Sequence, residues 1–272
     1  MGIFPYIGGK ASKAKWIVSN FPPNYTRMGY LEPFGGALSV FLEKSPSKVE
    51  VLNDKNEDIF ILWNVIKEQG PSLAREASLL PYSRKLYEEW AREWWQEGKR
   101  PSSSFERALR FFYLMHSNRS GKITYAGWNC VITRNSASPY REACRRIEYI
   151  QKRLQNAHLE CVDFREVIER LDHEDCLMYV DPPYIDTHYY IDFSLEDHKD
   201  LACLLNKAKS RIAISLYPHP LVEELYPPKR WNVLKKRFFK SAPNDPEKRE
   251  PATELLLLNY DPPRISLFGE EI

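Results

Sequence analysis

The first seventy residues alternate between short apolar runs and stretches with a helical spacing of apolar positions. Residues 30–34 and 48–52 form two β-type runs, the first ending in Gly35-Gly36 and the second in Asn53-Asp54. From 55 to 68, apolar residues recur every three or four positions, which is the spacing of one buried helix face. Residues 37–42, between the two strands, predict the start of another helix. Strand, glycine turn, helix, strand, acidic end and helix, in that order, predict a parallel α/β unit.

The same alternation returns after residue 157. The expected strands are 159–162, 176–180, 211–216, 231–239 and 252–260, and the expected helices are 164–171 and 197–210. The last two strands are joined by a polar loop, so they predict a terminal β-hairpin. A hairpin added to a parallel sheet makes a mixed sheet, and we therefore expect an α/β fold with a mixed sheet.

The middle of the chain has a different character. Helical spacing extends over 73–98, 105–116 and 140–155. Residues 118–139, rich in glycine, hydroxyl and aromatic side chains, have no helical period and predict a loop or hairpin. We therefore expect a mainly helical insert, residues 71–156, within a domain made of residues 1–70 and 157–272.

The insert also differs from the rest of the chain in charge. Residues 71–156 hold 16 Lys and Arg against 8 Asp and Glu, a net charge of +8, whereas the remainder has a net charge of −6. This asymmetry is typical of a segment that meets a polyanion. A solvated helical face explains the charge equally well, so charge alone does not name the partner.

Composition narrows the class of protein. The chain has no run of about eighteen apolar residues, so no membrane span is expected. Its N-terminal residues lack the apolar core of a secretory signal. The five cysteines and six histidines show no zinc-ligand spacing. We expect a soluble, reduced, cytoplasmic protein without a metal.

Candidate chemistry gathers where the predicted strands end. In open α/β sheets, ligands bind outside the carboxyl ends of the strands. Gly36 follows one strand, and Asp54, Asp163 and Asp181 follow three others. Each aspartate alone could be a helix N-cap. Because all four features stand at strand ends, a shared ligand site is the better interpretation, and the Asp54 spacing is typical of a ribose-binding carboxylate.

Asp181-Pro182-Pro183-Tyr184 is the most informative of these segments. Two prolines after a buried strand prevent further ladder bonding and hold the backbone extended. The segment presents a carboxylate, backbone carbonyls and an aromatic ring. This set suits a planar heterocycle with an exocyclic amine, which would donate to the oxygens and stack on the tyrosine ring.

Four motifs occur together in one order. They are Tyr6-Ile7-Gly8-Gly9-Lys10, Glu32-Pro33-Phe34-Gly35-Gly36-Ala37, Asn53-Asp54-Lys55-Asn56 and Asp181-Pro182-Pro183-Tyr184. With them the chain resembles the Dam-like DNA adenine methylases (alpha class, D12 type) over nearly its whole length. The resemblance implies a Rossmann-like S-adenosylmethionine-dependent methyltransferase fold. It also implies a target-recognition segment where the basic insert lies.

The resemblance assigns roles to residues of the motifs. It implies an S-adenosylmethionine site made by Tyr6, Lys10, Phe34, Gly35, Gly36, Asp54, Asp163, Phe164 and Asp181. The target adenine would be held by Asp181, Pro182, Pro183 and Tyr184. Tyr184 is expected to act through its ring, by stacking, rather than through its hydroxyl. The chain departs from many relatives at Leu38, where they continue the turn with another glycine.

The insert supplies the candidate DNA contacts. The expected DNA-binding residues are Arg119, Lys122, Asn129, Arg134, Arg141, Arg145 and Arg146. Arginine and asparagine can read base edges, and basic side chains hold phosphates. The partner implied is double-stranded DNA in a prokaryotic, phage or archaeal cell, with the protein a monomer or weak dimer.

The implied reaction is direct methyl transfer to the N6 amine of an adenine that is flipped out of the duplex. The enzyme would be an orphan methylase or the modification half of a restriction system. Two other functions stay open. One is methylation of an RNA adenine or a protein amide, and the other is a DNA-binding module that has lost catalysis.

Overall fold

The computed structural model describes residues 2–6, 9–119, 121, 123–185, 193–239 and 251–263. The chain divides into two compact units, each assembled from separate parts of the sequence. The first unit comprises Met1–Ala11, Gly36–Glu43 and Asp54–Cys161, and the second comprises Ser12–Gly35, Lys44–Asn53 and Val162–Ile272.

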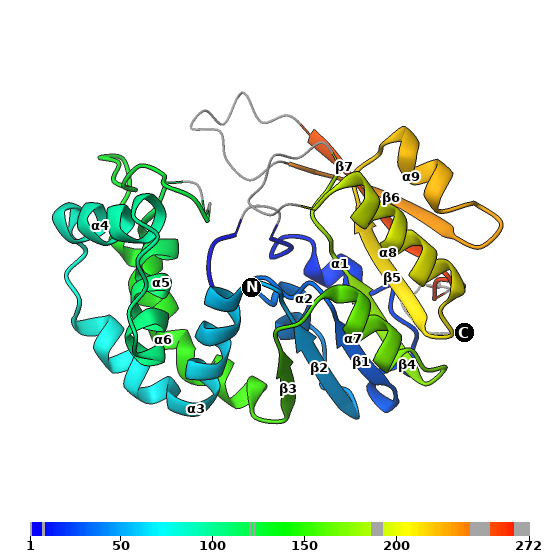
Figure 1. Cartoon of the computed structure of the whole chain (residues 1–272), viewed down its shortest axis with the longest axis horizontal. Helices are drawn as coiled ribbons and strands as arrows, with labels where there is room; N and C mark the ends of the chain where they lie inside the picture. The colour runs from blue at the N-terminus through cyan, green and yellow to red at the C-terminus, as the bar shows by residue number, and fades with distance from the viewer. Residues whose placement is uncertain are drawn as a thin grey trace. The chain divides into compact units, whose positions relative to one another are not determined.

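In the described part of the chain, seven strands form one mixed sheet in the order β3-β2-β1-β4-β5-β7-β6 (Figure 1). The strands are β1 (Gly29–Glu32), β2 (Val49–Asn53), β3 (Ala157–Glu160), β4 (Cys176–Val180), β5 (Arg211–Leu216), β6 (Asn232–Phe239) and β7 (Pro251–Leu258). β1 pairs in parallel with β2 and β4, and β4 pairs in parallel with β5. β7 runs antiparallel to both β5 and β6. The predicted mixed sheet with a terminal hairpin is confirmed.

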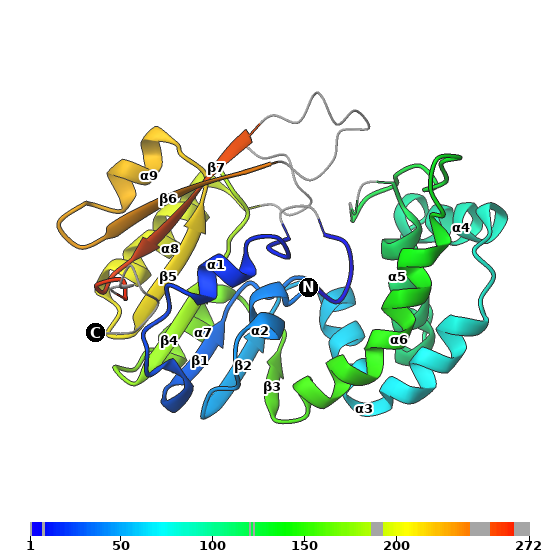
Figure 2. The same cartoon turned by 180° about the vertical axis from the view of Figure 1, so that it is seen from behind.

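The central strands of the second unit are apolar on both sides because helices cover both faces of the sheet. Every residue of β4 is buried, and so are five of the six residues of β5. α7 (Phe164–Leu171) and α8 (Leu195–Lys207) lie on one face (Figure 1). α1 (Ala14–Val18) lies on the other face (Figure 2). The sheet is thus the middle layer of a three-layer sandwich.

The first unit contains α2 (Ser39–Glu43), α3 (Glu57–Leu79), which runs into the predicted insert, and the helices within that insert. The latter are α4 (Arg84–Ala91), the π-helix η2 (Arg92–Gln96), α5 (Ser104–Ser117) and α6 (Ala137–Leu154). α3 packs against both α5 and α6. The loop after α5 carries two isolated antiparallel bridges, Asn118–Trp128 and Val131–Arg134, which agrees with the predicted loop or hairpin.

The predicted helix 73–98 is wrong, because the chain leaves the helix after Leu79. Ser83 caps the next helix by accepting from the Leu86 N–H. α3 instead begins before residue 70 and continues through Pro71, with a non-helical backbone at Gln69.

Side chains from the last turn of α6 and from the residue that follows it compensate for that proline. Pro71 cannot donate to the carbonyl of Lys67, which lies one turn earlier. Gln151 and Gln155 donate to this carbonyl instead, at 3.2 and 3.1 Å. The predicted domain boundary at residue 70 therefore falls inside a helix, and the division into residues 71–156 and the remainder stays a prediction.

Three short elements have no counterpart among the sequence-based expectations: α1, η1 (Tyr25–Arg27) and α9 (Pro220–Leu225). Helices this short carry too few periodic positions to be recognised and depend on tertiary packing. None of the helices in the described ranges combines the length and the apolar character that a membrane crossing requires.

Candidate active site

The second unit has a topological switch point between β1 and β4. From β1 the sheet is extended by β2 on one side, and β4 and β5 extend it on the other. Ligands of open α/β sheets bind at this point, outside the carboxyl ends of the strands. Pro33-Phe34-Gly35 follows β1, and Asp181-Pro182-Pro183-Tyr184 follows β4. The fold therefore brings two of the predicted motifs to neighbouring strand ends.

In the first unit, a buried carboxylate holds the glycine turn. Asp54 Oδ2 accepts from the Gly36 N–H at 2.8 Å, and Oδ1 accepts from the Asn56 N–H at 2.9 Å. Each carboxylate oxygen keeps further acceptor capacity. Asn56, not Asp54, caps α3. The helix-cap alternative for Asp54 is therefore wrong.

Burial changes the acidity of this group. It raises the pKa of Asp54 from 3.8 to about 6, although the N–H groups of Asn56 and Gly36 act in the opposite direction. Burial of a carboxylate without a paired cation carries an energetic cost. Such a cost is typical of functional positions.

Gly36 itself cannot be replaced without strain. Its φ of +51° lies in the left-handed region, and an added Cβ would stand 3.1 Å from Cε1 of Tyr6. Lys10 is buried, and Tyr6 is half-buried with its ring edge-on to Phe4 at 5.7 Å. The first unit thus brings Tyr6, Gly36 and Asp54 together.

Leu38 has a backbone conformation that is uncommon for a leucine. Its φ is +54°, in the left-handed region that glycine adopts freely. The side chain is fully buried. A buried leucine therefore stands at a backbone position that favours glycine.

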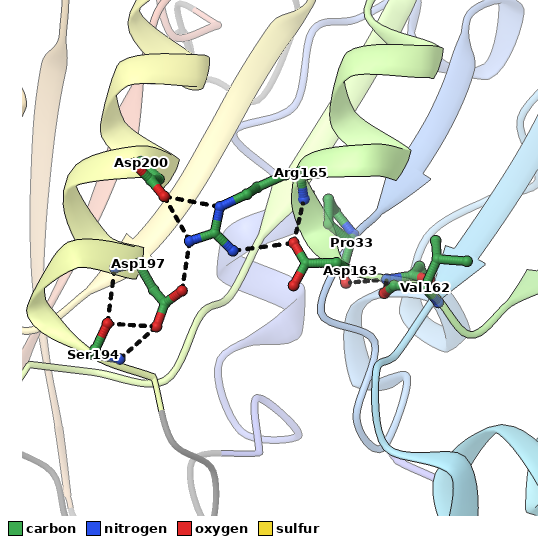
Figure 3. Close-up of polar contacts among 8 residues, drawn as sticks. Pro33, Val162, Asp163, Arg165, Ser194, Asp197 and Asp200 are labelled. Carbon is green, nitrogen blue, oxygen red and sulfur yellow. Dashed lines mark hydrogen bonds and ion pairs between the residues drawn. The ribbon is translucent and has the colours of Figure 1, made fainter.

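In the second unit, Asn53 ties two loops that follow strands. Its carboxamide donates to the carbonyl of Pro33 at 3.0 Å and to that of Val162 at 3.1 Å, and it accepts from the Val162 N–H at 3.0 Å. Figure 3 shows Pro33 and Val162 beside the start of α7. Asn53 is 1% exposed, so these bonds form away from solvent and fix the spacing of the two loops.

Asp163 has a structural role. It caps α7 by accepting from the Arg165 N–H at 3.0 Å, as the alternative for this aspartate predicts. The Arg165 guanidinium also binds Asp163, together with Asp197 and Asp200 of α8 (Figure 3). This network joins α7 to α8.

Aromatic rings gather beside that network. Phe34, Phe164 and Phe193 contact one another at centroid distances of 5.4 to 5.7 Å. Two of them, Phe34 and Phe164, are residues predicted for the cofactor site. Phe193 is an additional ring that the motifs did not indicate.

The Asp181–Tyr184 segment ends β4 without starting a helix. The helix that follows is capped by Ser194, so Asp181 is not an N-cap. Asp181 is half-buried, and Tyr184 is 9% exposed. The Tyr184 hydroxyl donates to Oε1 of Glu254 at 2.6 Å, and its ring meets that of Tyr217 edge-on at 4.4 Å.

Glu254 was missed by the sequence motifs. It lies on β7, is fully buried, and its Oε2 accepts from Nζ of Lys13 at 2.5 Å. The available signal was a single acid within the apolar run that ends in four leucines, because a charge inside a buried strand needs a partner.

The predicted DNA-binding residues are divided between two places in the first unit. Arg119 and Arg134 are exposed in the loop after α5, and Asn129 is half-buried there. Its N–H donates to the Ser117 carbonyl at 2.9 Å. Lys122 lies outside the described residues. Along this loop, the structure therefore presents at least two of the predicted basic side chains to solvent.

The arginines of α6 differ from one another. The Arg141 guanidinium donates to the carbonyls of Ser78 and Leu80, at the end of α3. Arg145 is exposed and pairs with Glu142 at 3.2 Å. Arg146 is half-buried. The structure thus gives Arg141 a structural partner that the sequence did not indicate.

Comparisons with known proteins agree with these motifs. Residues 6–241 match the model of a family described as D12 class N6 adenine-specific DNA methyltransferase. The chain is 25% identical over 294 residues to a protein of Methanocaldococcus jannaschii named type II methyltransferase M.MjaIII, covering 96% of this chain and 100% of that protein. It is also 25% identical over 202 residues to a DNA adenine methylase of Serratia marcescens, covering 70% of this chain and 73% of that protein. Among solved structures, it matches the rRNA methyltransferase aviRa of Streptomyces viridochromogenes with a TM-score of 0.43 and 11% identity, over 94% of this chain and 86% of that one.

Proposed function

The chain belongs to the D12 class of N6 adenine-specific DNA methyltransferases, and from that premise we propose how its residues divide the reaction. Family membership establishes methylation of adenine N6 in DNA and implies S-adenosylmethionine as the methyl donor. The residues that hold the donor, the target base and the DNA are the proposal.

The first unit fits the ribose end of the cofactor. Asp54 is buried, yet each of its oxygens can accept a further hydrogen bond, as two neighbouring hydroxyl groups require. Gly36 leaves room beside the Tyr6 ring that a Cβ would fill. We assign Asp54 to the ribose, and Gly36, Tyr6 and Lys10 to the wall around it.

Within the second unit, Phe34, Gly35 and Phe164 are assigned the cofactor-binding roles that the family motifs imply. Phe34 and Phe164 offer apolar ring surface for the cofactor adenine. Asp163 also holds the start of α7, because its Oδ1 accepts from both the backbone N–H and the guanidinium of Arg165. We assign Asp163 to the cofactor loop, which these bonds fix.

Asp181-Pro182-Pro183-Tyr184 is assigned to the target adenine, and its place at the end of β4 beside the switch point is the observation that carries the proposal. The amine would donate to the Asp181 carboxylate and to a proline carbonyl. Proline carbonyls on a rigid backbone are fixed acceptors. Tyr184 stacks on the base, which offsets part of the few kcal/mol needed to flip it out of the duplex.

These contacts account for the chemistry. S-adenosylmethionine supplies a methyl group bound to a sulfonium. Hydrogen bonds that N6 would donate to Asp181 and to a proline carbonyl would draw its lone pair out of conjugation and aim it at the methyl carbon. The Asp181 carboxylate would then accept the proton that N6 gives up on methylation.

DNA contact is assigned to the basic insert. Arg119, Asn129 and Arg134 are the candidates for base edges, and Arg145 and Arg146 for phosphates. The printed name of the Methanocaldococcus relative, a type II methyltransferase, favours a role in restriction-modification.

The proposal is tested by Asp181→Ala in single-turnover methyl transfer to duplex DNA, with RNA and protein substrates as parallel arms. We expect a loss of about 10²-fold or more, since one well-placed electrostatic contact contributes that much. Affinity for DNA should stay near that of the unaltered protein. Near-normal transfer by this variant would place the target site elsewhere, and transfer to RNA alone would overturn the DNA assignment.

A further inference from the structure

Within the second unit, Tyr184 is held by its hydroxyl and by its ring. Its hydroxyl donates to Glu254 at 2.6 Å, and its ring packs edge-on against Tyr217 with an interplanar angle of 75°. β7, which carries Glu254, is far from β4 in the sequence and enters the sheet as the antiparallel neighbour of β5. The C-terminal hairpin thus reaches the motif that is assigned to the target adenine.

Glu254 is itself fixed by a cation. It is 0% exposed, and Lys13, whose side chain is 11% exposed, approaches its other oxygen to 2.5 Å. The Lys13 ammonium also lies 5.4 Å from the centre of the Tyr217 ring, in a cation–π arrangement. A buried carboxylate of this kind is costly unless it is paired and hydrogen-bonded. Glu254 has both kinds of partner.

The hydroxyl of Tyr184 remains a donor under all ordinary conditions. Burial and the nearby charges of Asp181 and Glu254 raise its pKa well above the usual value. A phenol anchored by its hydroxyl and packed along its edge loses most of its freedom to rotate. A ring with a fixed plane can stack on a base without first being ordered.

We propose that Glu254, held by Lys13, is a positioning residue that fixes the Tyr184 ring for the target adenine. The inference rests on the proposed function, because it presumes that Tyr184 meets the flipped base. It also revises the expectation from sequence that only the ring of Tyr184 matters, since the hydroxyl is the point at which the ring is held.

The test is a double-mutant cycle with Tyr184→Phe, Glu254→Gln and the combined variant, measured as single-turnover methyl transfer to duplex DNA. We expect each single change to slow transfer about tenfold, the equivalent of one hydrogen bond to a charged group. The combined variant should be no slower than the slower single variant, because Tyr184→Phe removes and Glu254→Gln weakens the same hydrogen bond. Affinity for S-adenosylmethionine should not change.

Glu50→Gln is the matched control. Glu50 and Lys44 form a second buried ion pair of the same length in the second unit, with side chains 3% and 0% exposed. This variant should lower thermal stability and leave the transfer rate within about twofold. If Glu254→Gln behaves as Glu50→Gln does, or if the two effects in the cycle multiply, Glu254 is only structural.

Two further arms keep the outcomes distinct. Should Glu254→Gln fail to fold, Tyr184→Phe alone decides, since an unchanged rate in that variant overturns the inference. Asp181→Ala, assayed on the same DNA, separates the two proposals. If Asp181→Ala loses activity while Tyr184→Phe and Glu254→Gln keep the normal rate, the positioning role is overturned and the proposed function stands.

Discussion

At the scale of single residues, Asp54 illustrates how function opposes stability. Burial raises its pKa from 3.8 to about 6, so the folded protein binds this proton more tightly than the unfolded chain does. The contribution of the carboxyl to folding is therefore most favourable below pH 4 and is lost as the pH rises through 6. Above that pH the ionised group costs about 3 kcal/mol. Ribose hydroxyls would recover part of this cost by donating to the carboxylate.

We expect Asp54→Ala to weaken S-adenosylmethionine binding by about ten- to a hundredfold, as for loss of a charged acceptor. The unfolding free energy of the unaltered protein minus that of this variant should decrease as the pH rises from 4 to 7. Urea titration across that range and calorimetry of cofactor binding give the two quantities.

Asp172→Ala provides a control of opposite sign. Partial burial raises the pKa of Asp172, but N–H bonds from Lys209 and Ser210 outweigh it and lower the pKa below its usual value. Its stabilising contribution is therefore present at neutral pH and is lost on acidification. Parallel pH profiles for the two variants, or unchanged cofactor affinity in Asp54→Ala, would contradict the assignment of Asp54.

At the scale of elements, α6 carries two kinds of arginine on one helix. Arg141 donates to carbonyls at the end of α3, where the last turn leaves them without helical partners. Arg145 is 75% exposed and forms a salt bridge with Glu142, three residues earlier on the same helix. The first therefore belongs to the packing of α3 and α6, and the second is available to a phosphate.

Arg145→Ala combined with Arg146→Ala should weaken binding to all duplex sequences alike. The salt dependence of binding should fall by about one for each phosphate that the variant no longer neutralises. Arg141→Met, the comparison on the same helix, should destabilise the fold by about 1–2 kcal/mol and leave that slope unchanged. Fluorescence anisotropy at several salt concentrations and urea titration measure these effects. An unchanged slope in the double variant would remove α6 from the DNA-binding surface.

Elements also show what a sequence can predict. The limits of β4 and β5 agree with the predicted 176–180 and 211–216, because a buried central strand is apolar throughout and stops at a turn residue. The helix 73–98 was wrong because the residues around Pro81 leave the helix while those on either side keep its period. The boundary predicted at residue 70 falls inside a helix, because α3 continues through Pro71. Gln151 and Gln155 donate to the Lys67 carbonyl, which Pro71 cannot reach with an N–H of its own.

At the scale of the whole molecule, the motifs indicated the strand ends but not their neighbours. The order β3-β2-β1-β4-β5-β7-β6 depends on crossovers that no local pattern encodes. Glu254 could not be connected to Tyr184, because 70 residues separate them. Arg141 is of a residue type that often contacts DNA, but in the structure its guanidinium donates to carbonyls at the end of α3. Local chemistry was therefore readable, and long-range pairing was not.

Leu38 has a consequence for the entropy of ligand binding. A leucine in the left-handed region costs roughly 1–2 kcal/mol, and complete burial of its side chain offsets a cost of this size. The apolar anchor therefore keeps the turn in a single conformation before any ligand arrives, where glycine would sample several. Less conformational entropy is then lost when the ligand binds, which favours affinity. Leu38→Gly should make the binding entropy of S-adenosylmethionine more unfavourable by calorimetry, and an equal entropy in both proteins would show that the turn is ordered by other contacts.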